Sequence, residues 1–175
     1  HHYMTSTEKI RGWLTGRLPD DWFASEPTVE VDRDEIVIVG ALAEPERGED
    51  VTDEEHEAAI KGRIKRFRES TRDQRIRIAR ELERSSGRKV AWGVEAGGER
   101  KMFTTLAAPV MTRLRQPERR VLDTLVDSGV ARSRSDALGW CVRLVAQHAD
   151  DWLAELREAM TKVEEVRERG PNAEA

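Results

Sequence analysis

The sequence is poor in the residues on which many enzymes and metal proteins depend. Its 175 residues include one cysteine, Cys141, so a framework of intramolecular disulfides is excluded. Apart from the two residues that open the chain, histidine occurs only as His56 and His148, and neither belongs to a cluster with metal-ligand spacing. We therefore expect no metal site and interpret Cys141 as a small core residue.

Catalytic and cofactor-binding motifs are missing as well. The sequence contains no Walker loop, no dinucleotide fingerprint and no serine nucleophile elbow. The acidic pairs Asp20-Asp21 and Asp32/Asp34 fit a helix start and a hairpin turn better than acid–base chemistry. The sequence therefore predicts no catalytic residue, no cofactor, no small-molecule substrate and no enzymatic activity.

Long hydrophobic runs are also lacking. No apolar stretch approaches the length that spans a bilayer, and no signal peptide follows Met4. We expect a cytoplasmic protein without a membrane partner. Residues 1–3 are interpreted as the remnant of a purification tag, and the excess of arginine over lysine is typical of a GC-rich bacterial genome.

Charge is abundant and unevenly distributed along the chain. Charged residues make up 37% of the sequence, with a net charge of −4. Residues 17–57 hold three basic and fifteen acidic side chains, whereas residues 61–89 hold twelve basic and four acidic ones. Residues 99–120 add six basic and two acidic side chains. Basic stretches of this kind allow polyanion binding despite an acidic total, although they could instead neutralise the acidic segment within the fold.

The N-terminal part predicts alternating helices and strands. Helices are expected at 6–14, from 52 to about 68 and on to 86, with strands at 28–31, 35–40, 89–94 and 102–106. The polar run at 69–74 predicts a break or kink within the second helical region. Residues 44–53 are expected to form an exposed loop.

This order resembles the type II KH fold of bacterial RNA-binding proteins. The resemblance lies in Arg75-Ile76-Arg77-Ile78-Ala79 and Gly87-Arg88-Lys89-Val90, whereas Ser70-Thr71-Arg72-Asp73 occupies the place of the Gly-x-x-Gly loop without its glycines. Arginines could still contact phosphates from further away. The expected basic surface of this part comprises Arg63, Arg66, Arg72, Arg75 and Lys89.

The C-terminal part predicts a strand, a helix, a turn and one long helix. Residues 110–115 alternate, with Val110, Thr112 and Leu114 on one face and the other side chains on the opposite face. Pro117 suits a first helical turn and Gly129 suits a left-handed cap. A second helix is expected from Ser133, with Ser133 as its N-cap and Asp136 three residues on.

This arrangement resembles the ribbon-helix-helix family of DNA-binding dimers. The resemblance is carried by Met111-Thr112-Arg113-Leu114-Arg115, by Val121-Leu122-Asp123-Thr124-Leu125 and by residues 129–138. It implies that Met111, Arg113 and Arg115 read base edges in the major groove. It also implies that Arg132, Ser133, Arg134 and Ser135 hold a phosphate at a helix N-terminus.

Apolar residues follow the last helix start at alternating four- and three-residue steps. Such a stripe needs a partner surface, which is either the rest of the chain or a second copy of it. We expect a homodimer. Its predicted interface comprises Leu138, Val142, Val145, Trp152, Leu156 and Val163.

Together these patterns predict an α+β protein in two parts. Residues 4–98 form a KH-like domain, residues 99–170 form a ribbon-helix-helix-like unit with an extended last helix, and residues 171–175 form a disordered tail. The function predicted first is a dimeric nucleic-acid-binding protein, with DNA favoured over RNA, that regulates transcription. An RNA- or ribosome-associated protein and a non-catalytic interaction scaffold are the alternatives.

Overall fold

The computed structural model describes residues 6–171, which divide into two compact units at Pro109 and Val110. Unit 1 precedes this boundary, unit 2 follows it, and each is described by itself. The predicted tag remnant lies outside the described residues, as do residues 172–175 of the predicted tail. The α+β fold class is confirmed, because the chain combines helices with a four-stranded sheet.

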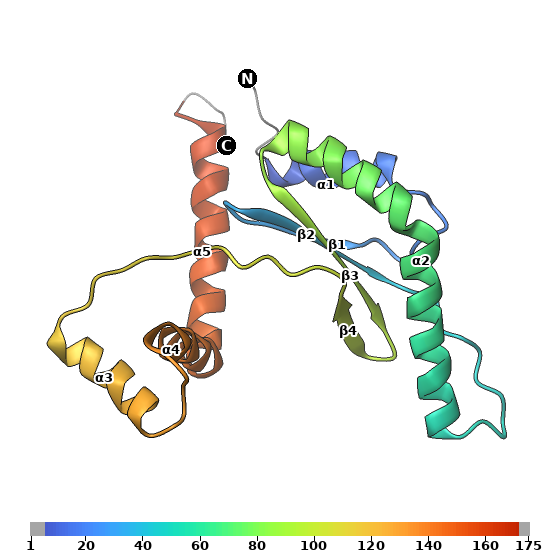
Figure 1. Ribbon diagram of the computed structural model, residues 1–175. Helices are drawn as coiled ribbons and strands as arrows, with labels where there is room; N and C mark the ends of the chain where they lie inside the picture. Colours follow the sequence, from blue (N-terminus) through green and yellow to red (C-terminus); the bar gives the residue numbers. More distant parts are fainter. Residues whose placement is uncertain (1–5, 172–175) are drawn as a thin grey trace. The chain divides into compact units, whose positions relative to one another are not determined.

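Unit 1 contains two helices and the sheet (Figure 1). Its elements are α1 (Thr7–Arg17), β1 (Thr28–Val31), β2 (Glu35–Ala41), α2 (Asp53–Ser86), β3 (Lys89–Ala96) and β4 (Glu99–Met102). The strands lie in the order β1-β2-β3-β4, as two antiparallel hairpins joined by a parallel β2–β3 pair. The helix α2 connects the two central strands, because parallel neighbours require a crossover connection.

The core of unit 1 lies between the sheet and its helices. Alternate positions of β2 and β3 point inward, and Ile38 pairs with Trp92 at the centre of the sheet. The ring of Phe23 lies directly against Gly40, where any side chain would clash with it. The most deeply buried side chains come from both helices and both central strands: Ile10, Leu14, Ile36, Ile38, Ile78, Leu82 and Val94.

The helix α2 is one continuous helix, and Figure 1 shows it bent near its middle. The bend agrees with the kink predicted for the polar run at 69–74, whereas the break predicted as its alternative is absent. Thr52 caps its first turn by accepting a hydrogen bond from the Glu55 N–H (3.1 Å), and Gly87 ends it in the left-handed conformation. Within the polar run, the Thr71 hydroxyl donates to the Phe67 carbonyl (2.6 Å). A hydroxyl that bonds back to the preceding turn keeps its polar group satisfied without ending the helix.

The predicted boundary between residues 98 and 99 is displaced in the structure. Residues Glu99–Met102 form β4, which pairs with β3 through a turn at Gly97 and Gly98, both with positive φ. The last strand of this unit therefore ends where the sequence predicted that it would begin, at Met102. Pairing with β3 places these residues in unit 1.

Unit 2 consists of α3 (Gln116–Asp127), α4 (Arg134–His148) and α5 (Asp150–Arg169). The predicted strand at residues 110–115 is not formed in the single chain, since no neighbouring segment pairs with it. The predicted long helix is also divided, because Ala149 leaves the helical conformation (φ −122°, ψ 23°). The Asp150 carboxylate then accepts from the Asp151 N–H (2.9 Å) at the start of α5.

No helix within residues 6–171 combines the length and the apolar character that crossing a membrane requires.

Candidate nucleic-acid interface

The turn between α3 and α4 is closed by reciprocal capping. The Ser133 hydroxyl accepts from the Asp136 N–H (3.1 Å), and the Asp136 carboxylate accepts from the Arg132 N–H (3.0 Å). Gly129 adopts a positive φ of 82° in the preceding turn. The predicted N-cap is therefore confirmed, and the amides of Arg134 and Ser135 begin the helix, where backbone donors lack partners within the helix itself.

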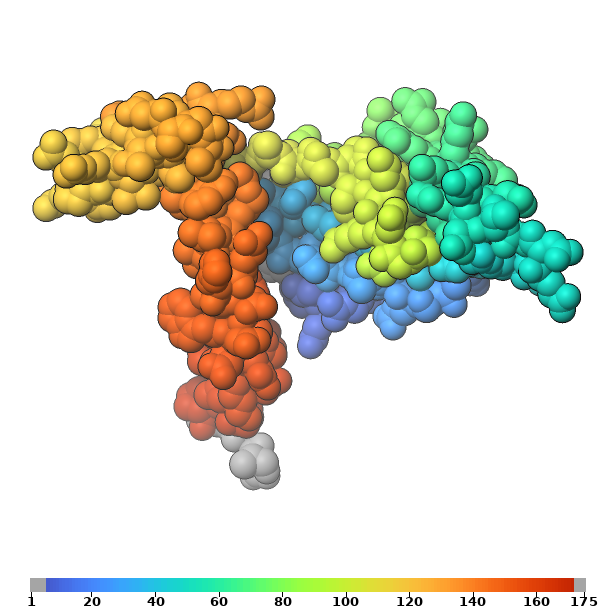
Figure 2. Space-filling view, turned by 90° about the horizontal axis from the view of Figure 1, so that it is seen from below, coloured from blue at the N-terminus to red at the C-terminus, as the bar shows by residue number. Residues whose placement is uncertain are grey.

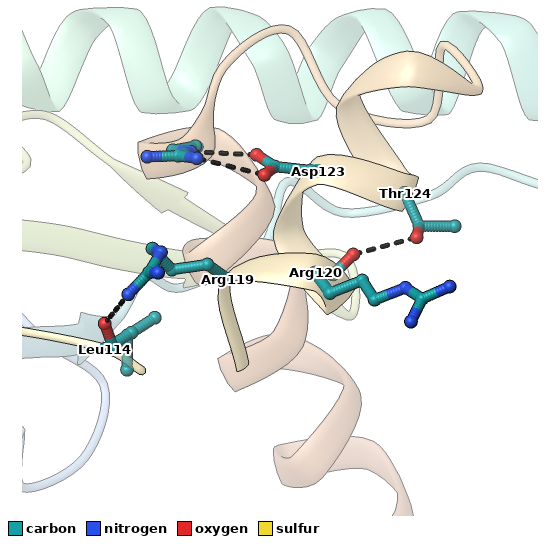
Figure 3. Close-up of polar contacts among 6 residues, drawn as sticks. Leu114, Arg119, Arg120, Asp123 and Thr124 are labelled. Carbon is teal, nitrogen blue, oxygen red and sulfur yellow. Dashed lines mark hydrogen bonds and ion pairs between the residues drawn. The ribbon is translucent and has the colours of Figure 1, made fainter. Parts of the chain in front are cut away.

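The guanidinium of Arg134 forms a two-pronged ion pair with Asp123 of α3 (Figure 3). The distances are 2.8 Å from Nε to Oδ1 and 2.9 Å from Nη2 to Oδ2. The hydrogen bonds between the two side chains favour their charged forms. They lower the pKa of the Asp123 carboxyl and raise the pKa of the Arg134 guanidinium. This side chain, predicted to bind phosphate, therefore joins α4 to α3 in the structure.

The segment before α3 carries the three predicted base-reading residues on its exposed side. Met111 is 94% exposed, and Arg113 and Arg115 are exposed as well. Leu114 is half-buried against the small core of unit 2, and its carbonyl accepts a hydrogen bond from Arg119 Nη1 (2.6 Å; Figure 3). Val110 and Thr112, predicted to share the inward face with Leu114, are exposed, so Leu114 is the one position of that face that contacts the core.

The same segment borders the N-terminus of α4 across a groove of about 310 Å³. Met111 therefore lies at the same groove as Arg134 and Ser135, although the whole of α3 separates them in the sequence. The residues that line this groove are Val110, Met111, Thr112, Leu114, Arg119, Leu122, Arg134, Ser135 and Leu138.

Two basic residues of this region were missed by the sequence analysis. Arg119 and Arg120 lie on α3 and line a second hollow of about 550 Å³ together with Asp123 and Arg134. In Figure 3 the side chain of Arg120 points away from Leu114 and Arg119, toward the side on which Thr124 lies. Their position in the basic stretch at residues 99–120 was the available signal, but no motif distinguished them from a solvated helix face.

Of the predicted basic residues of unit 1, Arg66, Arg72 and Lys89 are exposed and Arg63 is half-buried. Arg63 and Arg66 line a cleft on one side of α2. The two units are described separately, so these residues and those of unit 2 form separate sets.

The prediction that Arg75 contacts nucleic acid is wrong, because Arg75 is buried. Its Nε donates to the Thr71 hydroxyl (2.9 Å), and its Nη2 donates to the Arg68 carbonyl (2.7 Å). The guanidinium lies 4.9 Å from the centre of the Phe103 ring. Burial lowers the pKa of Arg75, and the nearby charges of Arg68 and Arg72 lower it further. Arg75 therefore holds the segment after β4 against α2.

The predicted interface residues divide between a small core and an exposed stripe. Leu138 packs with Leu122, Ala131 and Ala137 in the core of unit 2. The remaining positions are exposed, and Figure 2 shows most of α5 as a column (orange to red) that no other segment of unit 2 covers on that face. We define the exposed stripe as Val142, Val145, Trp152, Leu156, Met160, Val163 and Val166.

The fold and the site define an α+β domain followed by a separate helical unit with a groove beside the start of α4. Residues 8–102 match the family described as Rv1265-like protein, N-terminal domain, and residues 115–167 match the Mb1296 C-terminal domain. The chain belongs to this Rv1265-like family. The two matched regions correspond to unit 1 and unit 2, and the residues between them form no helix or strand.

Relatives in mycobacteria share most of this chain. It is 56% identical over 163 residues to the uncharacterized protein Mb1296 of Mycobacterium bovis and to the uncharacterized protein Rv1265 of Mycobacterium tuberculosis strain H37Rv. Each alignment covers 93% of this chain and 70% of the relative. No solved structure matches the chain significantly.

Proposed function

We propose that this protein is a dimer that binds nucleic acid through unit 2, with duplex DNA as the favoured target and transcriptional regulation as the role. The observation that carries the proposal is the extended segment at 110–115. It presents Met111, Arg113 and Arg115 to solvent and lies beside the N-terminus of α4.

The small core of unit 2 supports dimer formation. Its buried side chains are Leu122, Ala131 and Ala137, and two of these are alanines. Domains of about 60 residues are marginal even when they bury about 60% of the surface that the unfolded chain exposes. The stripe on α4 and α5 leaves further apolar surface in solvent, and a second copy of the chain would bury it.

A second copy would also supply the missing strand partner. Two copies of residues 110–115, paired antiparallel across a two-fold axis, would satisfy each other's backbone N–H and C=O groups. Leu114 would then face the core, as its half-buried position already indicates. Arg113 and Arg115 would lie on the opposite face, where an arginine can donate two hydrogen bonds to a guanine edge.

The start of α4 supports binding of the nucleic-acid backbone. Free amides at a helix N-terminus and the helix dipole favour a phosphate. In this unit the contribution of Arg134 would come from its backbone N–H, because its side chain is held by Asp123. Arg119 and Arg120 on α3 add positive charge beside the same groove.

The proposal is tested by fluorescence anisotropy with a labelled duplex at increasing salt. Each phosphate contact contributes about 0.9 to the slope of log affinity against log salt. Replacing Arg113 and Arg115 by alanine should weaken binding at least about tenfold, because each loses a charge-assisted contact. The matched control replaces two arginines of α5, Arg157 and Arg167, and should bind as the unmodified protein does.

Two results would contradict the proposal. One is the absence of duplex binding at low salt. The other is an equal loss of affinity in the control variant, which would indicate a non-specific charge effect. Binding to single-stranded RNA but not to duplex DNA would favour the RNA-binding alternative. In that alternative the phosphate contacts would come from exposed arginines such as Arg72, since residues 70–73 lie within α2.

An interaction scaffold is the second candidate, favoured by the exposed stripe of α5. In that case the arginines of unit 2 have no role in binding. Reversing the charge at Arg113 and Arg115 by substitution with glutamate separates the two functions. Loss of DNA binding with the dimer intact supports nucleic-acid binding as the function. Capture of a protein partner that the substitutions leave unchanged, with no effect on binding to DNA, supports the scaffold.

A further inference from the structure

Unit 1 contains a cleft of about 650 Å³ beside α2 to which no role has been assigned. It is formed where the segment after α1 and the end of β2 face one side of α2, and Figure 1 shows the blue segment after α1 passing beside that helix. Its volume falls within the range of about 300–1,000 Å³ that is typical of small-molecule sites. The lining residues are Pro19, Asp21, Trp22, Leu42, Ala43, Arg63, Arg66, Phe67, Ser70, Thr71 and Gln74.

The charged lining of the cleft, two arginines against the single carboxylate of Asp21, favours an anion. Arg63, Arg66, Ser70 and Gln74 follow one another at three- and four-residue steps, which places them along one side of α2. Arg63 is fixed, because its Nη1 donates to the Ala43 carbonyl at the end of β2 (2.6 Å). A guanidinium carries five N–H donors, so this bond leaves others for a ligand. These cationic and hydroxyl or amide groups match the acceptor oxygens of a phosphate or carboxylate.

The cleft also has an apolar part, which is formed by aromatic residues. Trp22 and Phe67 both line the cleft and contact each other edge to face, with ring centres 5.7 Å apart. Trp22 also contacts Trp92 in the same geometry at 6.0 Å. Trp22 and Phe67 belong to the core and are only 8% and 9% exposed, so a small, firmly supported part of each ring faces the cleft.

We propose that this cleft binds a small oxyanion attached to a flat, apolar group. Arg66 and Arg63 would bind the phosphate or carboxylate oxygens, Ser70 and Gln74 would add hydrogen bonds, and Trp22 and Phe67 would contact the ring. The inference is independent of DNA binding by unit 2. No sequence motif indicates this cleft, because its lining comes from three separate segments of the chain.

The proposal is tested by isothermal titration calorimetry of the full chain with phenyl phosphate, inorganic phosphate and benzyl alcohol. Phenyl phosphate should bind in a saturable manner and more tightly than either of the other probes, since only it satisfies both parts of the cleft. Replacing Arg66 by glutamine should weaken phenyl phosphate binding about tenfold or more, because a charge-assisted hydrogen bond is lost.

Two further variants make the result specific to the cleft. Ser70→Phe places a bulky side chain in the cleft and should abolish binding, whereas Arg80→Gln removes an exposed charge elsewhere on α2 and should leave it unchanged. Thermal melting by circular dichroism checks that each variant is folded. The first variant, Arg66→Gln, keeps the test decisive if Ser70→Phe does not fold.

Several results would overturn the proposal. These are no saturable binding of phenyl phosphate, equal binding of inorganic phosphate, or the same loss in Arg80→Gln as in Arg66→Gln. Competition between phenyl phosphate and duplex DNA, together with weaker DNA binding by Arg66→Gln, would assign the cleft to a nucleic-acid surface instead.

Discussion

Replacing Trp152 by alanine should weaken the proposed dimer more than any other single truncation in the stripe. Trp152 is 59% exposed in the single chain. Complete burial of a large apolar side chain contributes about 1.5–3 kcal/mol, so covering the exposed part contributes about 1–2 kcal/mol in each copy. A two-fold dimer loses this contribution twice, about 2–4 kcal/mol, which corresponds to a Kd raised roughly 30- to 700-fold.

Sedimentation velocity over a series of concentrations measures this change. The unmodified chain should be dimeric at micromolar concentration, and Trp152→Ala should shift the dimer–monomer transition to higher concentration. Arg157→Ala lies on the same helix at an exposed polar position and serves as the control. The double variant Trp152→Asp and Leu156→Lys should give a monomer or an unfolded chain.

The reasoning is refuted if the unmodified chain is monomeric at micromolar concentration. It is equally refuted if Trp152→Ala and Arg157→Ala associate alike. The first result would show that no second copy of the chain covers the stripe, and the second would assign the dimer to another surface.

Two further predictions concern the ion pairs and buried charges. Arg75→Ala should lower the free energy of unfolding by about 2 kcal/mol, because it leaves a cavity beside Phe103. Arg75→Met should change the free energy of unfolding by less than about 1 kcal/mol, because removing a buried charge offsets the lost hydrogen bonds. Urea unfolding measures both changes, and neither variant should alter DNA binding. Hydrogen bonding to Arg134 lowers the pKa of Asp123, so the stabilisation by this pair is present above the unfolded-state pKa of about 4 and is lost as the pH falls through the lower folded-state pKa. The stability difference between the unmodified chain and Asp123→Asn should therefore shrink on acidification below about pH 4 in chemical unfolding, and a constant difference down to the acid limit would contradict the assigned cause.

Features that depend on a few neighbouring residues could be predicted from the sequence. The cap at Ser133 and the hairpin of β1 and β2 are of this kind, because their hydrogen bonds connect residues close together in the chain. In the hairpin, the Asp32 carboxylate accepts from the N–H groups of Asp34 and Glu35, each at 2.8 Å. Such turns follow from residue type alone.

Features that depend on distant contacts could not be predicted in this way. The polar run at 69–74 was interpreted as a break or kink because it contains no apolar residue and offers a possible capping box at Ser70 and Asp73. The helix is not broken there, since Thr71 and Arg75 are buried and Arg75 donates to the Thr71 hydroxyl and lies over the Phe103 ring. At Ala149 a break was missed. The apolar periodicity of the side chains continues past this residue and predicted one long helix, but the backbone of Ala149 leaves the helical conformation. The strand at 110–115 needs a partner that a single chain does not contain.

The candidate site was predicted in part. Met111 and Ser135 do lie at one groove, and the residues of the capped helix start are where they were expected. The engagement of Arg134 by Asp123 was not foreseen, because it joins two helices across a turn. The cleft of unit 1 was missed for the same physical reason, since its lining is assembled by tertiary packing.

The order of strands in unit 1 has a consequence for the kinetics of its folding. The hairpins β1–β2 and β3–β4 close through short turns and can form early. The parallel ladder between β2 and β3 forms only when the whole chain between Ala41 and Lys89 has been brought together, which is an entropically costly closure. Most of that connection is α2, whose formation shortens the span that must close. The transition state of folding should therefore contain α2, the two central strands and the hairpins that pair each central strand with its edge strand.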